Sequence, residues 1–138
     1  MRVVLDTNIF VSALLVHGSQ PAELITQWRH GKFAVLTAEP QLNELMRVTR
    51  YPKIRSRLNP SIAGRLINDI RDLAVMVNKL NPVDASPDPF DNYLLSIAST
   101  GRADYLVTGD KSDLLALKKY DGCLIVSVSE FFALTGGR

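Results

Sequence analysis

The sequence has one cysteine and two histidines among its 138 residues. Cys123 has no second cysteine with which to form an internal disulfide, and a zinc site built from cysteines is excluded for the same reason. His17 and His30 are too few for a cluster of histidine ligands. These absences argue against zinc chemistry.

Long apolar runs are also missing. No stretch of about 18 uninterrupted apolar residues is present, and Asp6 interrupts the apolar run at the N-terminus. We therefore expect no membrane span, no signal peptide and a cytoplasmic location. The composition, 46% hydrophobic and 22% charged residues, is typical of a soluble globular protein, and the length suits one domain with a core of its own.

Charge is spread unevenly along the chain. The net charge of +2 conceals a segment from Arg47 to Lys79 with eight basic and two acidic residues, a net charge of +6. Residues 1–46 have a net charge of −1 and residues 80–138 one of −3. A solvated surface is the usual explanation of such a basic run. It is also what an enzyme acting on phosphodiesters needs, because metal-binding carboxylates alone would repel the substrate.

Short strand-like runs alternate with helical patterns along the chain. We expect strands at Arg2–Leu5, Phe33–Thr37, Asp104–Val107 and Leu124–Val126 and helices at about 8–15, 21–29, 39–49, 60–80, 90–100, 112–118 and 130–134. Strands separated by helices need crossover connections. The pattern therefore predicts a single α/β domain over residues 1–138, with a mostly parallel central sheet flanked by helices on both faces.

The clearest helix follows Asn59-Pro60, which supplies a cap and a first-turn proline. Its apolar residues recur at intervals of three or four and predict one buried stripe, formed by Ile62, Leu66, Ile70, Leu73 and Val77. Gly101 is the expected C-cap of the helix over residues 90–100.

Four acidic residues are expected to meet at one edge of the sheet. Asp6 follows a strand in Val-Val-Leu-Asp-Thr-Asn, and Asp110 follows another in Leu-Val-Thr-Gly-Asp-Lys. Asp91 opens a helix, and Glu44 lies about one turn into the helix after the second strand. The carboxyl ends of parallel strands are where open α/β sheets build their sites.

Carboxylates gathered in this way would repel one another and would be costly to bury without a cation. Oxygen ligands suit Mg²⁺ or Mn²⁺, which would polarise a phosphate oxygen and lower the pKa of a water molecule. One of the carboxylates would help to remove a proton from the attacking water. Simpler interpretations exist, because Asp6, Asp91 and Asp110 can cap the helices that they precede. Glu44 can be an ordinary surface residue.

The order of these motifs resembles the PIN domains, and in particular the bacterial and archaeal branch described as toxins of toxin–antitoxin systems, the VapC-like ribonucleases. The matching pieces are Val-Val-Leu-Asp-Thr-Asn at 3–8, Glu44 in its helix, Ser-Pro-Asp-Pro-Phe-Asp-Asn at 86–92 and Leu-Val-Thr-Gly-Asp-Lys at 106–111. The resemblance runs nearly from end to end. It implies a parallel sheet with flanking helices and a Mg²⁺- or Mn²⁺-dependent endoribonuclease.

The resemblance also implies roles for single residues. The expected catalytic and metal-binding residues are Asp6, Glu44, Asp91 and Asp110. Asn8 and Thr108 would orient the carboxylates or the water. Asp88 remains an alternative to Asp91 as a direct ligand, and Asp113 an alternative to Asp110. The implied partners are RNA, a cognate antitoxin protein and, as an open alternative, a second copy of the chain in a homodimer.

The basic segment supplies candidates for binding the RNA backbone, namely Arg50, Lys53, Arg55 and Arg57, which surround the Tyr51-Pro52 break in an expected loop. Three rival functions remain open. A Mg²⁺-dependent phosphatase or phosphoryl-transfer enzyme could use an aspartyl nucleophile, although Asn8 stands where many such enzymes have a second acid. A receiver-type signalling domain would not need the basic segment. A PIN-fold binding module without nuclease activity would not need all four acids.

Overall fold

The chain folds around one β-sheet. A computed structural model describes residues 1–109 and 112–136, and within them the sheet has six strands in the order β3-β2-β1-β4-β6-β5. The strands are β1 (Arg2–Leu5), β2 (Ala34–Thr37), β3 (Val75–Met76), β4 (Tyr105–Val107), β5 (Lys119–Tyr120) and β6 (Cys123–Val126). All neighbouring strands are parallel except β5 and β6. The expected α/β class with a mostly parallel sheet is confirmed.

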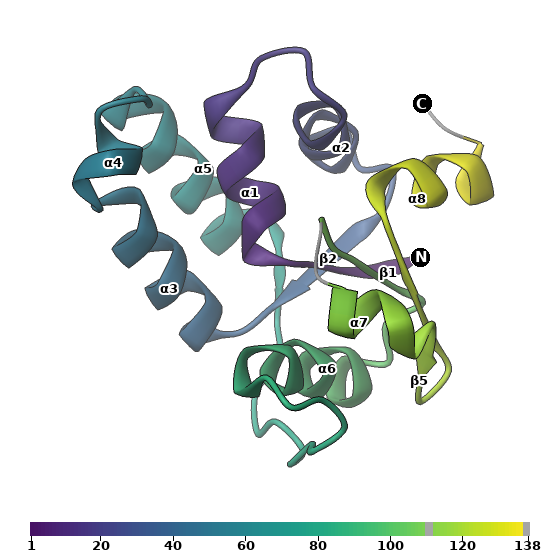
Figure 1. Cartoon of the computed structure of the whole chain (residues 1–138). Coiled ribbons are helices and arrows are strands. Elements are labelled where there is room, and N and C mark those ends of the chain that lie inside the picture. The colour runs from purple at the N-terminus through teal and green to yellow at the C-terminus, as the bar shows by residue number, and fades with distance from the viewer. Residues whose placement is uncertain (110–111, 137–138) are drawn as a thin grey trace.

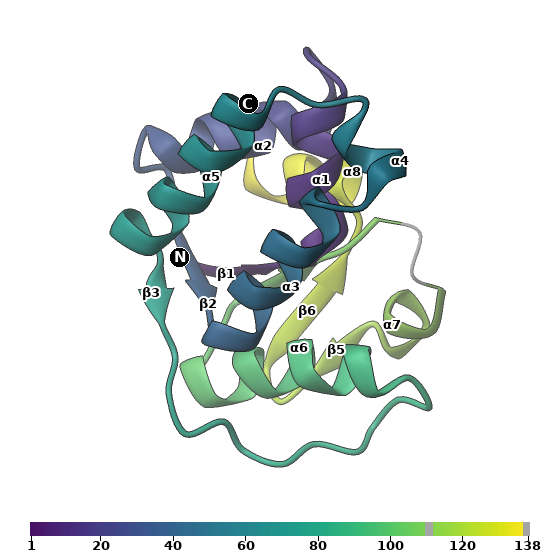
Figure 2. The ribbon, with the colours of Figure 1, turned by 90° about the vertical axis from the view of Figure 1, so that its left-hand side faces the viewer.

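Helices cover both faces of the sheet (Figures 1 and 2). One face carries α1 (Thr7–Leu15), α2 (Gln20–Arg29), α3 (Glu39–Thr49), α5 (Pro60–Leu73) and α8 (Val128–Thr135), with the short α4 (Pro52–Arg55) between α3 and α5. The other face carries α6 (Pro89–Gly101) and α7 (Ser112–Leu117). In the part of the chain that the structure describes, none of these helices has the length and apolar composition needed to cross a membrane.

The alternation of side chains along the strands separates two cores. Val3 and Leu5 of β1 belong to the cluster under α1, α2, α5 and α8, whereas Val4 belongs to the cluster over α6 and α7. Successive strand residues point to opposite faces, so a strand buried on both sides reads as one continuous apolar run. The runs that predicted these strands therefore reflect a sheet covered on both faces.

The direction in which strands are added to the sheet reverses between β1 and β4. From β1 the chain proceeds to β2 and β3 on one side, then returns to β4 on the other side of β1 and continues to β6. The connections on the two sides lie on opposite faces, so they diverge between β1 and β4 (Figure 2). Such a point is where open α/β sheets bind ligands. Asp6 follows β1 and Thr108 follows β4, so both residues lie at this point.

The prediction of one helix over residues 60–80, up to Asn81-Pro82, is wrong at its C-terminal end. α5 stops at Leu73, and Val75–Met76 forms β3, which pairs in parallel with the end of β2. The expected apolar stripe is also incomplete, because Ile62 and Leu73 are exposed. Hydrogen bonding to the open edge of β2 decides the conformation here, since the Val77 N–H donates to the Thr37 carbonyl (2.8 Å).

Three further local predictions need correction. The expected loop after Tyr51 contains the helical turn α4, which begins at Pro52. β5 has no counterpart among the expected strands. Gly101 is the last helical residue and not the C-cap, which is Arg102 in a left-handed conformation. A Cβ at Gly101 would lie 2.7 Å from Leu36 Cδ1, so glycine here allows α6 to approach β2 closely.

Candidate active site

Asp6 is held between the ends of β1 and β4. Its backbone N–H donates to the Val107 carbonyl (2.9 Å), so the chain stays in the sheet up to this residue. The side chain is 3% exposed. Asp6 Oδ2 accepts a hydrogen bond from the Thr108 hydroxyl (2.8 Å), and Oδ1 accepts from the Asn8 N–H (3.4 Å). Asp6 is thus the N-cap of α1, and at the same time its carboxylate is oriented by the neighbouring strand.

A buried glutamine supports the turn that carries Asp6. Gln41, near the start of α3, is 1% exposed. Its Nε2 donates to the Leu5 carbonyl (2.7 Å) and its Oε1 accepts from the Thr37 hydroxyl (2.6 Å). The side chain therefore links the ends of β1 and β2 with α3. Gln41 was not among the residues expected from sequence, although a polar side chain one turn before the buried Leu45 is an unusual choice for the inner face of a helix.

Glu44 and Asp6 line the same pocket, which has a volume of about 490 Å³ and is called the acidic pocket below. Its lining residues come from α1, α3, α4, the start of α6 and the turn after β4: Asp6, Thr7, Asn8, Val11, Ser12, Glu44, Val48, Ile54, Phe90 and Gly109. The Glu44 side chain is 13% exposed, and Glu44 Oε2 lies 3.9 Å from Arg47 Nη2. An ion pair this long to an arginine that is mostly exposed adds little stability.

Asp91 is a buried residue in the first turn of α6, with 1% of its surface exposed. Its Oδ2 accepts a hydrogen bond from the Ser86 hydroxyl (3.0 Å). The cap of this helix is Asp88, whose Oδ1 accepts from the Phe90 N–H (2.9 Å). The capping interpretation therefore applies to Asp88 and not to Asp91. Asp91 does not belong to the lining of the acidic pocket.

Asn92 holds the loop that precedes α6. Its Oδ1 accepts from the backbone N–H groups of Ala85 (3.0 Å) and Ser86 (2.8 Å), and its Nδ2 donates to the Ser86 carbonyl (2.8 Å). These bonds place the Ser86 hydroxyl beside Asp91. Ser86 and Asn92 both belong to the motif at 86–92, but its sequence alone indicated no role for either.

The remaining acidic candidates are Asp110 and Asp113. Asp113 is exposed in the first turn of α7 and does not line the acidic pocket. Asp110 lies outside the residues that the structure describes. Across residues 1–109 and 112–136, no group of three or more acidic, histidine or cysteine side chains is arranged to hold a metal ion.

Tyr93 packs beside the acidic pocket on α6. Burial, and then the negative charge of Glu44, raise the pKa of its phenol, so the hydroxyl stays neutral at physiological pH. The ring contacts Phe90 edge to face, with centroids 6.3 Å apart. Phe90 is 38% exposed and lines the acidic pocket. The start of α6 therefore presents aromatic surface next to the carboxylates.

The four basic candidates are all exposed. In sequence they lie next to Val48 and Ile54, which line the acidic pocket. Arg50 caps the C-terminus of α3, Lys53 and Arg55 belong to α4, and Arg57 follows α4. Within the described ranges, none of the four forms an ion pair. Ile54 of the same helix α4 lines the acidic pocket, whereas Arg50 and Arg55 line a neighbouring pocket.

Comparison with known proteins adds independent information. A family model described as PIN domain matches residues 2–112. An uncharacterized protein of the archaeon Methanocaldococcus jannaschii is 28% identical over 119 residues, which cover 86% of this chain and 76% of that protein. No solved structure matches significantly.

Proposed function

The chain belongs to the PIN domain family, whose model covers residues 2–112, and on this premise we propose that it is a metal-dependent endoribonuclease. PIN domains are generally nucleases that use divalent metal ions. The observation that carries the proposal is the pocket at the divergence of β1 and β4, which two carboxylates line. The acidic character of the pocket, together with the exposed basic residues carried by the α4 segment, suits an ion and a phosphodiester.

The donor set fits Mg²⁺ or Mn²⁺. Mg²⁺ is commonly held by one or two carboxylates, with water and substrate phosphates as its other ligands. Asp6 and Glu44 supply two carboxylates, and the polar side chains of Asn8 and Ser12 line the same pocket. We propose Asp6 and Glu44 as metal-binding residues, and we keep Asp91 and Asp110 as candidates for further ligands. The bound ion would supply a polarised phosphate and a water molecule of lowered pKa.

The protein's own residues have distinct tasks in this proposal. Thr108 and the Asn8 N–H fix the orientation of the Asp6 carboxylate through their hydrogen bonds to its two oxygens. Ser86 does the same for Asp91. One of these carboxylates accepts the proton of the attacking water, so that no nucleophilic side chain is required. Asp88 caps α6 and Asp113 is exposed, so neither is assigned a direct role.

The proposal is tested by incubating the purified protein with single-stranded RNA in Mg²⁺, in Mn²⁺ and in EDTA. Internal cleavage that needs the metal supports an endoribonuclease. Hydrolysis of p-nitrophenyl phosphate without cleavage of RNA would favour the phosphatase alternative. Metal binding with neither activity would favour a binding module.

Thr108→Val should lower the affinity for Mg²⁺ by about tenfold to a hundredfold, the range found for groups that orient metal ligands. The valine has nearly the shape of threonine but cannot donate to Asp6 Oδ2, and Thr108 is fully buried, so water cannot replace the hydroxyl. The measurement is the rise in melting temperature with increasing Mg²⁺. Thr26→Val, at an exposed position of α2, is the matched control. Identical Mg²⁺ titrations for the two variants would contradict the role of Thr108.

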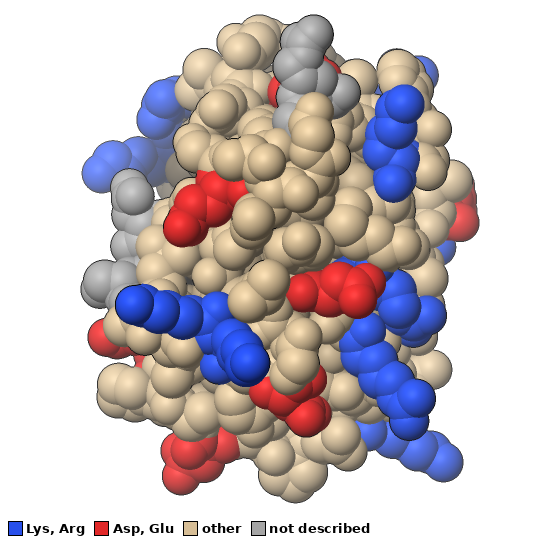
Figure 3. Space-filling model, turned by 90° about the vertical axis from the view of Figure 1, so that its right-hand side faces the viewer, with Lys and Arg blue, Asp and Glu red and all other residues tan. Residues whose placement is uncertain are grey.

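The basic residues around α4 are proposed to bind the RNA backbone. Helix α4, which carries Lys53 and Arg55, lies on the left of the molecule in Figure 1, together with α3 and α5. The opposite side, where α8 and β5 lie, shows acidic and basic side chains interspersed (Figure 3). A basic surface attracts phosphates, whereas a surface of mixed charge attracts them far less.

Replacing Arg55 and Arg57 together by glutamine should weaken RNA binding and lower the slope of log affinity against log salt by roughly 0.7 for each phosphate that the protein no longer neutralises. The cleavage rate at saturating RNA should change little, because the residues touch the substrate outside the acidic pocket. The control is Lys32→Gln with Lys119→Gln, which removes two exposed charges elsewhere. If both double variants have the wild-type salt slope, the α4 surface does not bind RNA.

We further propose that the chain is the toxin of a toxin–antitoxin pair. This role requires a cognate antitoxin protein, and the presence of a neighbouring small gene for a DNA-binding protein would support it. Induced expression in bacteria should then arrest growth, and co-expression of the neighbouring protein should restore it.

A further inference from the structure

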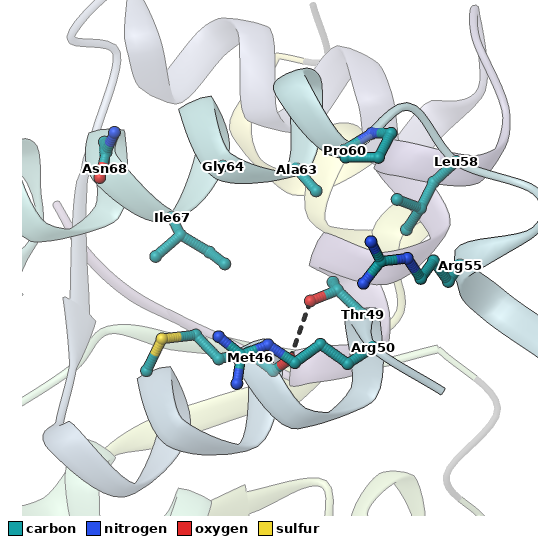
Figure 4. A pocket seen from close by; sticks show the side chains of 10 residues that line it. All are labelled: Met46, Thr49, Arg50, Arg55, Leu58, Pro60, Ala63, Gly64, Ile67 and Asn68. Carbon is teal, nitrogen blue, oxygen red and sulfur yellow. Dashed lines mark hydrogen bonds between the residues drawn. The ribbon is translucent and has the colours of Figure 1, made fainter. Parts of the chain in front are cut away.

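A second pocket lies between α3, α4 and α5, with a volume of about 290 Å³ (Figure 4). The apolar part of its lining, called the apolar floor below, comes mainly from α3 and α5, which also contribute the polar Thr49 and Asn68. The guanidinium groups of Arg50 and Arg55 come from the ends of α3 and α4. The lining residues are Met46, Thr49, Arg50, Arg55, Leu58, Pro60, Ala63, Gly64, Ile67 and Asn68. Among the described residues, the lining thus includes two cations and no carboxylate.

This pocket shares a wall with the acidic pocket. Val48 lines the acidic pocket and the next residue, Thr49, lines the second one. In the same way, Ile54 lines the acidic pocket and Arg55 the second one. The end of α3 and the turn α4 thus separate two cavities with opposite charge.

We propose that the second pocket holds one nucleotide of a single-stranded RNA, with the base on the apolar floor and a neighbouring phosphate at the arginines. The inference rests on the proposed ribonuclease function. Ala63 and Ile67 project from α5 toward Met46 and Arg50 on α3, and the Arg55 side chain extends into the space between the two helices (Figure 4). Unstacked bases are commonly bound on apolar surfaces and on guanidinium planes.

The size and charge of the pocket favour a nucleotide over a protein segment. An α-helix with its side chains is about 10–12 Å wide and does not fit into a cavity of 290 Å³. A single apolar side chain would fit, but it would leave both guanidinium groups without an anion. A nucleotide can place its base on the apolar floor and its phosphate at the two arginines.

Gly64 permits a test that leaves every charge in place. It is an exposed residue of α5 that lines the pocket, and a Cβ built on it meets no atom within 4 Å. The Cβ of Gly64→Leu therefore has room, the rest of its side chain takes up space at the pocket, and leucine is a better helix former than glycine. Ser61→Leu adds the same side chain to the same helix outside the pocket lining and is the matched control.

Binding is measured by fluorescence anisotropy in EDTA, which separates it from cleavage. The probes are a single-stranded RNA of mixed sequence and a set of copies in which one base at a time is removed. For the wild type and Ser61→Leu, removal of one particular base should weaken binding about tenfold, as expected for a bound base. Gly64→Leu should bind the intact RNA about tenfold more weakly, be insensitive to that removal and keep the wild-type salt slope.

Two results would overturn the inference. If Gly64→Leu binds the intact RNA as tightly as the wild type, the pocket does not hold a base, and a partner protein becomes its better occupant. If removal of no single base weakens RNA binding by the wild type, the RNA is bound through its backbone alone. Absence of any RNA binding by the wild type would instead count against the proposed function. A circular dichroism melt of both leucine variants shows whether each is folded.

Discussion

Replacing Asp6 by asparagine is expected to lower the rate of metal-dependent RNA cleavage by at least about a hundredfold, more than is usual for the loss of a group that only orients a ligand. The amide removes the negative charge that an ion requires. It keeps an oxygen that can accept from the Asn8 N–H, and the Thr108 hydroxyl can rotate to accept from the new NH₂ group. The variant should therefore be folded, and a melting curve in EDTA checks this.

The control for this variant is Asp113→Asn, which removes the same charge from an exposed position of α7. Both variants are compared at saturating Mg²⁺ and RNA, so that the rates report the reaction and not binding. Wild-type cleavage by Asp6→Asn would show that the site is misassigned. Equal losses in both variants would show that the overall charge matters and not the carboxylate at the end of β1.

The second large effect is expected for Gln41→Leu, which should lower the free energy of unfolding by about 2–4 kcal/mol, because a buried polar group left without its partner costs about 1–3 kcal/mol. Leucine has a similar size but cannot accept from the Thr37 hydroxyl or donate to the Leu5 carbonyl. Thr37 is completely buried, so water cannot replace the missing acceptor. Urea denaturation monitored by circular dichroism measures the change.

The double variant Thr37→Val, Gln41→Leu should regain part of this stability. Replacing both members of a buried hydrogen-bonded pair with apolar groups of similar shape is much less costly than removing one of them. A double-mutant cycle of the wild type, Thr37→Val, Gln41→Leu and the double variant therefore isolates the interaction between the two side chains. A double variant that is less stable than Gln41→Leu would mean that the pair is not the source of the effect.

The local pattern of apolar residues was sufficient to predict the positions of the central strands and of most helices. β1, β2, β4 and β6 each begin within one residue of the predicted start, because each is a short apolar run bounded by helical patterns. Runs of this kind are buried on both faces only in a covered parallel sheet. The fold class thus followed from the alternation of elements.

The two edge strands did not follow from the apolar pattern. β3 and β5 contain two residues each, and each forms because a neighbouring strand offers unpaired backbone groups. For β5 a local signal nevertheless exists. Asp121 and Gly122 form the two-residue loop between β5 and β6 and have φ values of 49° and 81°. An Asp-Gly pair with two positive φ angles is typical of a tight hairpin.

The sequence by itself determined the family, the fold class and the order of the acidic motifs along the chain. Only the tertiary structure decided how these residues are used. The hydrogen bond from Thr108 to Asp6 joins residues 102 positions apart, and the bond from Gln41 to Leu5 spans 36 positions. The placement of Asp6 and Glu44 in one pocket, and of Asp88 as a cap beside the buried Asp91, depends equally on packing. The physical reason is that strand register and helix packing set such distances, and neither is encoded in the spacing of residues along the chain.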